Sequence, residues 1–281
     1  MSDANSQQAD YWEERSASWL ESEHYVAKIS ARFGPLAIDR LSLKPGQQVL
    51  DIGCGSGPTT LDLASRVGPD GNAVGVDISP SMIAAAVDRA RSTSVANVRF
   101  AVADAQVDDL GASSYDAVFS RFGVMFFADP VAAFTNIRQA LRPGGRLAFA
   151  CWQNVFANEW MLVPGAAVAA VTGELPAMPA PGEPGPFSMA EPGLVEAVLE
   201  PAGFTEIEVT ESNDTVVVPE ADIDTMVKMS TSMGPARVAI QDADDETRER
   251  LVDAVRTALV ERVEHGEVRL SAAAFIVSAR A

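Results

Sequence analysis

Histidine and cysteine are scarce in this sequence, which contains two of each. The cysteines, Cys54 and Cys151, lie far apart in the chain, and so do the histidines, His24 and His265. Such isolated residues do not form the ligand pattern of a structural zinc site, and so few cysteines are typical of a reducing compartment. We therefore expect no metal, no disulfide and a cytoplasmic protein.

Positive charge is also in short supply. The chain has 21 Lys and Arg against 39 Asp and Glu, which gives a formal net charge of −18. A protein with this balance repels the phosphate backbone of DNA or RNA, so we expect no nucleic-acid partner.

Long apolar runs are missing as well. The longest nearly apolar stretch, MLVPGAAVAAV from Met161, contains Pro164 and Gly165 and falls short of the roughly 20 residues needed to cross a bilayer. The N-terminus also lacks the basic and apolar regions of a signal peptide. We therefore expect no membrane partner and no export.

Between residues 49 and 151, short apolar runs alternate regularly with segments of helical periodicity. This alternation is typical of βαβ units that build a parallel sheet. The runs predicted to be strands are residues 49–52, 73–76, 98–102, 115–120 and 146–151. Two helices are expected to begin at a capping residue followed by proline, Ser79-Pro80 and Asp129-Pro130. The second of them is expected to run until Pro143.

The regular alternation of predicted strands and helices ends after Cys151. The proline-rich stretch LPAMPAPGEPGPF at 175–187 predicts an irregular insertion. A helix is expected to begin near Ser188, with Glu191 completing a capping box, and another near Asp242. Strands are expected around residues 207–209 and 271–279.

A glycine-rich loop follows the first predicted strand, in the sequence VLDIGCGSG at 49–57. Ligands of open α/β sheets bind outside the carboxyl ends of the strands, where glycine lets the backbone approach them. The dinucleotide fingerprint G-x-G-x-x-G needs a third glycine at position 58, but Pro58 is there and Gly57 comes one residue early. The spacing favours a nucleoside ligand without phosphate and weakens a nicotinamide-dependent oxidoreductase, which we keep as an alternative.

Five motifs, in this order, resemble those of class I S-adenosylmethionine-dependent methyltransferases. They are VLDIGCGSG at 49–57, GVDIS at 75–79, ADA at 103–105, YDAVFSRFGVMFF at 115–127 and ALRPGGRLAF at 140–149. Within this class the chain looks most like the branch related to the ubiquinone and menaquinone biosynthesis methyltransferases, where many natural-product enzymes also lie. The resemblance implies S-adenosylmethionine as cofactor.

The fold that the resemblance implies is α/β and Rossmann-like, with seven mostly parallel strands and helices on both faces. We expect four parts: an N-terminal helical lid (1–44), a cofactor-binding core (45–151), a lid or insertion (152–190), and the C-terminal part of the core sheet (191–281). The last part is expected to carry a helical insertion at about 219–265.

The resemblance also assigns cofactor contacts residue by residue. The glycine-rich loop is expected beside the methionine part, with Asp51 anchoring that loop. Asp77 is expected at the two ribose hydroxyls, and Asp104 at the adenine amino group. The implied cofactor residues are Asp51, Gly53, Gly55, Ser56, Gly57, Asp77, Ile78, Asp104, Ala105 and Ser120. Three of them have simpler interpretations: Asp51 as a helix cap, Asp77 as a turn residue and Asp104 as part of a solvated acidic turn.

The flanks of the core are rich in large apolar side chains. They contain all four tryptophans: Trp12, Trp19, Trp152 and Trp160. Met226, Met229 and Met233 recur at helical spacing, which indicates either a core stripe or the wall of an apolar substrate pocket. We infer that the flanks cover the site and that the substrate is a small, partly apolar molecule.

Two residues are candidates for acting on the acceptor of the methyl group. A sulfonium is already activated, so a base is needed only where the acceptor must lose a proton. His24 could be that base, or a surface histidine beside Glu21 and Glu23. Arg121 could orient an anionic acceptor, or pair with an acidic neighbour. The acceptor atom (O, N or C), a monomer or a homodimer, and a non-catalytic ligand-binding protein all stay open.

Overall fold

The computed structural model describes residues 5–93, 95–175, 179, 182–232, 234 and 236–281. Among these, one mixed sheet runs through the molecule in the strand order β3-β2-β1-β4-β5-β8-β6, with a short β7 paired to β8. Its strands are β1 (Gln48–Ile52), β2 (Asn72–Asp77), β3 (Val98–Val102), β4 (Tyr115–Arg121), β5 (Leu141–Trp152), β6 (Thr205–Pro219), β7 (Val263–Glu264) and β8 (Glu267–Arg280). The predicted Rossmann-like fold is confirmed: seven strands form the main order, and the two-residue β7 is an additional, eighth strand.

The five central strands are parallel, while β8 pairs antiparallel with both β5 and β6. The order turns at β1 and β4, so the loops leaving these two strands diverge at the carboxyl edge of the sheet. This divergence is the place where open α/β sheets bind ligands.

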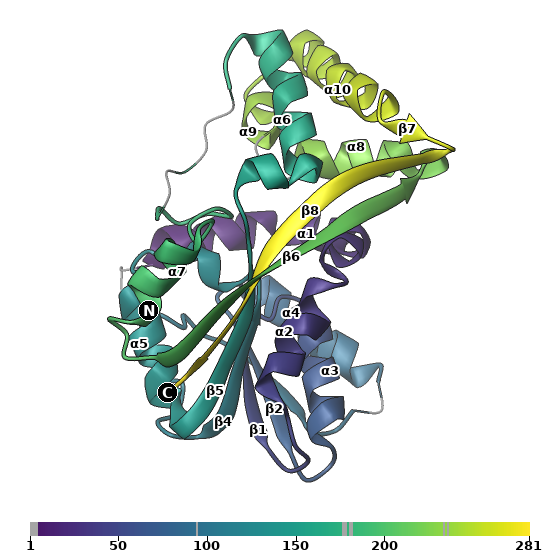
Figure 1. The fold of residues 1–281 in the computed structure, drawn as a ribbon. Helices are drawn as coiled ribbons and strands as arrows, with labels where there is room; N and C mark the ends of the chain where they lie inside the picture. Colours follow the sequence, from purple (N-terminus) through teal and green to yellow (C-terminus); the bar gives the residue numbers. More distant parts are fainter. Residues whose placement is uncertain (1–4, 94, 176–178, 180–181, 233, 235) are drawn as a thin grey trace.

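Helices cover both faces of the sheet (Figure 1). α2 (Phe33–Leu41), α3 (Pro58–Val67) and α4 (Pro80–Arg91) pack against β1 to β5 and β8, whereas α5 (Pro130–Ala140) and α7 (Pro192–Leu199) contact each other and pack against β5 and β6. The sheet between them is apolar, and Leu50, Phe119 and Phe149 are fully buried.

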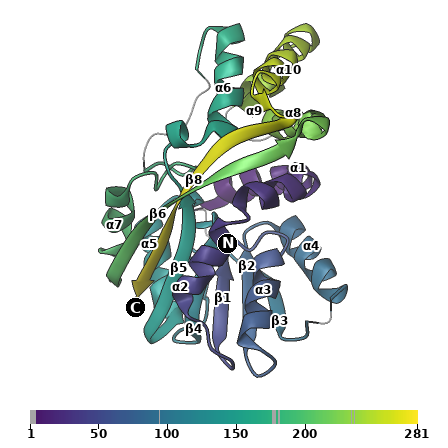
Figure 2. The ribbon, with the colours of Figure 1, turned by 45° about the vertical axis from the view of Figure 1, so that its right-hand side comes forward.

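A second group of helices sits beyond the carboxyl edge of the sheet. It contains α6 (Glu159–Thr172), α8 (Ile223–Ser232), α9 (Ala236–Gln241) and α10 (Asp245–Val260). The long β6 and β8 strands extend up to this group (Figures 1 and 2). The 25-residue helix α1 (Ser6–Ser30) lies between this group and the sheet, and contacts both α4 and α8.

The two proline-marked helix starts are confirmed. The Ser79 hydroxyl accepts a hydrogen bond from the Met82 amide, and the Asp129 carboxylate accepts one from the Ala132 amide. The end of the second helix differs from the prediction, because α5 stops at Ala140 and β5 already begins at Leu141. Pro143 is the reason: a proline disfavours helical geometry in the residue before it.

The capping box predicted at Ser188 is wrong. α7 begins only at Pro192, and Glu191 precedes it without a side-chain cap. The Ser188 hydroxyl instead donates to the Met125 carbonyl oxygen at 2.7 Å. Ser188 therefore holds the insertion against the segment that follows β4. Part of the proline-rich stretch, at 176–178 and 180–181, lies outside the described residues.

No helix in the described ranges is both long enough and apolar enough to span a membrane. Likewise, no cluster of three or more His, Cys, Asp or Glu side chains in these ranges is arranged to hold a metal ion. Both cysteines are free thiols in buried positions.

Candidate active site

A cavity of about 740 Å³ is lined by residues of α1 and by residues at the carboxyl ends of β1, β2 and β4. Its size falls within the range of ligand pockets, roughly 300–1,000 Å³. Nine of the residues predicted for the site line it: Gly53, Gly55, Ser56, Asp77, Ile78, Asp104, Ala105, His24 and Arg121. The other three, Asp51, Gly57 and Ser120, are not among its lining residues.

The three glycines of the first motif have different reasons to be glycine. All have positive φ, but a Cβ on Gly53 would lie 2.8 Å from the Cα of Gly123, and one on Gly57 would lie 2.7 Å from the Phe100 ring. These two glycines let backbone and side chains pack closely. A Cβ on Gly55 would meet nothing within 4 Å, so Gly55 leaves open space where the loop faces the cavity.

Asp51 lies beneath the loop and is completely buried. One of its oxygens, Oδ2, accepts hydrogen bonds from the hydroxyls of Thr59 and Thr60, at 2.9 and 2.7 Å. Its other oxygen has no hydrogen-bond partner among the described residues. Burial raises the pKa of Asp51 to about 6, against the two threonine hydroxyls and the charge of Arg121. Asp51 therefore anchors the first turn of α3 through side chains.

Asp77 connects the ends of β1 and β2. Its Oδ2 accepts from the Gly55 amide at 2.8 Å, and its Oδ1 from the Ser79 amide at 3.0 Å. Each oxygen keeps lone-pair capacity for a further donor from the cavity. Burial raises the pKa of this carboxyl above its ordinary value, although the backbone donors oppose the shift. Asp77 makes the local turn contact of the simpler interpretation and also faces the cavity.

Asp104 is almost fully buried, so the interpretation as a solvated turn is wrong. Its Oδ1 accepts from the Gln106 amide at 2.9 Å and from the Asn5 side-chain amide at 3.2 Å. Asn5 also lines the cavity, and its own side-chain oxygen is buried without a partner among the described residues. The side-chain amide of Asn5, as donor, and the carboxylate of Asp104, as acceptor, therefore lie side by side at this end of the cavity.

Helix α1 is held to the core by two glutamates that sequence reasoning missed. Glu13 accepts from the Ser79 hydroxyl at 2.6 Å and from the Ser81 amide at 3.2 Å. The hydroxyl of Ser79 is the largest of the causes that lower the pKa of Glu13. Glu23 accepts from the Ser56 hydroxyl and forms an ion pair with Arg89. The helix thus contacts the loops after both β1 and β2.

Ser120 and Arg121 follow each other at the end of β4 but differ in role. The Ser120 hydroxyl is buried, donates to the Ile52 carbonyl at 2.8 Å and accepts from the Gly123 amide at 3.2 Å, so it joins the ends of β1 and β4. Arg121 lines the cavity and has no hydrogen bond or ion pair within the described ranges. Burial lowers the pKa of its guanidinium, although the charges of Asp51 and Glu23 act in the opposite direction.

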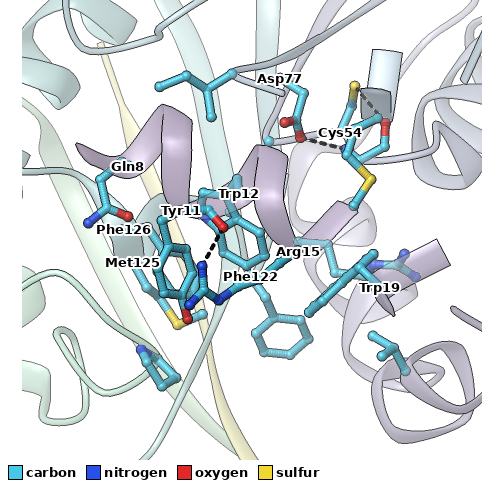
Figure 3. Close-up of a pocket in the computed structure, with 18 of the residues that line it drawn as sticks. Gln8, Tyr11, Trp12, Arg15, Trp19, Cys54, Asp77, Phe122, Met125 and Phe126 are labelled. Carbon is cyan, nitrogen blue, oxygen red and sulfur yellow. Dashed lines mark hydrogen bonds between the residues drawn. The ribbon is translucent and has the colours of Figure 1, made fainter. Parts of the chain in front are cut away.

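Aromatic side chains form the remaining wall of the cavity. Phe122 stacks on Trp152 with ring centroids 3.9 Å apart, and Trp12 meets Phe126 edge to face at 4.8 Å. Figure 3 shows Tyr11, Trp12, Arg15 and Trp19 of α1 together with Phe122, Met125 and Phe126 from the segment after β4. All four tryptophans line the cavity, as inferred from their place in the flanks.

His24 lies at the cavity, whereas the described methionines of the predicted stripe do not. His24 also lines the cavity, but it is an exposed residue of α1. Met226 and Met229 are buried and are not among the lining residues, which agrees with a core stripe; Met233 lies outside the described residues.

Comparisons with known proteins identify similar chains among methyltransferases. A family model described as a methyltransferase domain matches residues 43–172. Aklanonic acid methyltransferase DauC from Streptomyces sp. (strain C5) is 31% identical over 147 residues, which cover 51% of this chain and 67% of that protein. Nocamycin O-methyltransferase from Saccharothrix syringae is 32% identical over 185 residues, which cover 62% and 66% respectively.

Among solved structures, the YcgJ protein from Bacillus subtilis has a similar fold. Its TM-score is 0.58 at 17% identity, over 89% of this chain and 98% of that one.

Proposed function

We propose that this chain, which belongs to the class I S-adenosylmethionine-dependent methyltransferases, transfers the methyl group of its cofactor to a small, partly apolar molecule. The proposal is supported by the cavity of about 740 Å³, which is lined both by predicted cofactor residues and by an aromatic wall. The names of the two bacterial relatives describe methyltransferases of aklanonic acid and nocamycin, which supports a small-molecule acceptor. The likeness to the ubiquinone and menaquinone branch stays a prediction.

The residues present fit S-adenosylmethionine. The Asp77 carboxylate, with free lone pairs in the cavity, suits the ribose hydroxyls, and the open space at Gly55 suits a chain passing along the loop. The unpaired oxygen of Asp51 places negative charge beneath that loop, which suits a cationic methionine end. Asp104 and the Ala105 amide suit the adenine edge, beside Ile78.

A nicotinamide cofactor fits less well. Pro58 is the first residue of α3, and a proline has no backbone amide to donate. The helix therefore lacks one of the donors with which such a turn holds a pyrophosphate. This feature argues against the oxidoreductase alternative.

The cofactor supplies a methyl group on a positively charged sulfur. In an in-line displacement, a lone pair of the acceptor forms the bond to the methyl carbon, while the carbon–sulfur bond breaks and its electrons stay on sulfur. The chain's own residues align the two partners and keep water out. We assign Arg121 to orienting the acceptor, because it lines the cavity and forms no hydrogen bond or ion pair with the described residues. His24, at the rim, takes the acceptor's proton where there is one to remove.

The test is a methyl-transfer assay with methyl-labelled S-adenosylmethionine and a panel of aromatic acids, phenols and amines. Labelled product formed in step with S-adenosylhomocysteine is the expected result, and it is expected to be lost in Asp77→Ala. A chain that binds the cofactor but methylates nothing in the panel would favour a non-catalytic binding protein. The domain boundaries, the cytoplasmic location and the oligomeric state, a monomer or a homodimer, stay predictions.

A further inference from the structure

Several arginine side chains line the cavity of this acidic chain. Four arginines line it: Arg15, Arg89, Arg121 and Arg237. Arg89 pairs with Glu23. Arg15 forms a long ion pair of 3.7 Å with the mostly exposed Glu14. Among the described residues, the side chain of Arg237 has a hydrogen bond to the neutral side chain of Gln241 and no ion pair. In a protein of net charge −18, unpaired arginines facing a cavity need an explanation.

Arg15 is the most restrained of them. Its Nη1 donates to the Tyr11 carbonyl oxygen at 2.7 Å, and its guanidinium carbon lies 3.5 Å from the centroid of the Tyr11 ring. The Nε of Arg15 is buried and has no hydrogen-bond partner among the described residues. A buried donor without an acceptor costs free energy, which a ligand oxygen would recover. Figure 3 shows this side chain beside Tyr11 and Met125.

Arg237 reaches the same cavity from a different helix, α9. Burial lowers the pKa of Arg15 and the charge of Arg237 lowers it further, whereas Tyr11 and Glu14 raise it. Like charges in a partly desolvated space repel each other unless an anion lies between them. A guanidinium pair is well suited to bind a carboxylate, which accepts two parallel hydrogen bonds.

We infer that Arg15 and Arg237 form a binding site for the carboxylate of an aromatic acceptor. The acceptor's ring would lie along the wall that contains Trp12 and Phe126. This inference rests on the proposed function and names its substrate class: planar aromatic molecules that carry an acidic group. Arg15 and Arg237 are specificity-determining residues in this account, distinct from Arg121 at the end of β4.

Two probes of equal shape isolate the charge: anthraquinone-2-carboxylate and anthraquinone-2-carboxamide. Their binding to the full chain, saturated with S-adenosylhomocysteine, is measured by quenching of tryptophan fluorescence. The carboxylate is expected to bind at least about tenfold more tightly than the amide, the size of one charge-assisted hydrogen bond. Arg15→Gln is expected to remove this preference. Arg237→Gln, a change in the separate helix α9, is expected to reduce it.

The matched control is Arg99→Gln, which removes the same charge from an exposed position of β3 outside the cavity. This variant is expected to keep the full preference. Equal binding of the two probes, binding of neither, or an unchanged preference in Arg15→Gln would overturn the inference.

Titration of the same variants with S-adenosylmethionine separates the two levels of the account. Unchanged cofactor affinity in Arg15→Gln, with a lost carboxylate preference, supports the acceptor site. A comparable loss of cofactor affinity would mean that Arg15 binds the carboxylate of the cofactor itself, and would overturn the inference. Absence of cofactor binding in the unmodified chain would instead contradict the proposed function.

Discussion

The Asp77 carboxylate accepts a hydrogen bond from the Gly55 amide at 2.8 Å, and both residues face the same cavity. The end of β2 therefore fixes the loop that leaves β1, so that the contacts expected for ribose and for the methionine part are set by one interaction. Because a charged acceptor strengthens a hydrogen bond, this contact keeps the loop in place before a ligand arrives.

The glycines of this loop are expected to separate stability from binding. Gly57→Ala places a Cβ against the Phe100 ring at 2.7 Å in a left-handed backbone. We expect it to lower the free energy of unfolding by about 1–3 kcal/mol from overpacking, in addition to about 1–2 kcal/mol from the backbone conformation. In Gly55→Ala the new Cβ has no atom within 4 Å. We therefore expect the free energy of unfolding to fall by only about 1–2 kcal/mol, because alanine disfavours the left-handed backbone conformation. Its new methyl group, however, enters the cavity and is expected to weaken cofactor binding.

Urea unfolding and calorimetric titration with S-adenosylmethionine check both expectations. Gly46→Ala is the matched control, because Gly46 also has positive φ and open space but lies outside the cavity. If Gly46→Ala weakened cofactor binding as much as Gly55→Ala, the loop would not be the contact.

Asp51 is expected to make folding stability depend on pH. Its pKa is raised by burial from 3.8 to about 6, so the folded state binds the proton more tightly than the unfolded state. The corresponding stability is present at low pH and is lost as the pH rises from about 4 to 6. A shift of this size corresponds to about 3 kcal/mol.

The Asp51→Asn variant lacks this titration but keeps an oxygen for Thr59 and Thr60. The stability difference between the unmodified chain and Asp51→Asn, measured by urea unfolding at a series of pH values, is therefore expected to fall across that window. A difference that stays constant with pH would show that Asp51 does not titrate there.

Glu13 is expected to control how firmly α1 covers the cavity. Glu13→Gln weakens the contacts to Ser79 and Ser81, so the amides of α1 should exchange hydrogen faster and cofactor affinity should fall. Because the pKa of Glu13 is lowered, the docking is present above its ordinary value of 4.5 and is lost as the pH falls further. Asp10→Asn, at an exposed site on the same helix, is the control and should leave exchange unchanged.

Arg121 is expected to act on the acceptor and not on the cofactor. With an acceptor identified by the assay above, Arg121→Gln should lower kcat/KM by at least about tenfold, the value of one charged contact, while cofactor affinity stays the same. Steady-state kinetics with both substrates measure the change. Arg121→Lys, which keeps the charge but loses the planar fork, should be intermediate. Full activity in Arg121→Gln would leave Arg121 without a role in orientation.

The sequence predicted the central sheet closely, because strands buried on both faces are uniformly apolar. The first predicted strand, 49–52, differs from β1 (Gln48–Ile52) by one residue. The prediction was less accurate for the edge strand β6, which extends from Thr205 to Pro219 and includes the polar stretch ESNDT. Its partner β8 supplies the hydrogen bonds along this stretch. Most β6 residues are exposed or half-buried, so an apolar pattern is not needed there. Edge strands carry little hydrophobic signal.

Some residues of the site could also be predicted from the sequence, and others could not. Asp77 and Asp104 belong to motifs next to strand ends, so local sequence predicted their place. Glu13 and Asn5 could not be predicted, because their partners lie 66 and 99 residues away in the chain and no periodicity relates them. Nothing in the motif itself indicates that Gly57 packs against the Phe100 ring.

We propose that the carboxylate of Asp77 holds S-adenosylmethionine in this cavity. The most direct measurement is a calorimetric titration of the unmodified chain, of Asp77→Asn, and of Asp70→Asn as a control for an exposed aspartate. We predict one site per chain, unchanged in Asp70→Asn and weakened at least about tenfold in Asp77→Asn. Absence of binding to the unmodified chain, or equal affinity in all three proteins, would contradict the account.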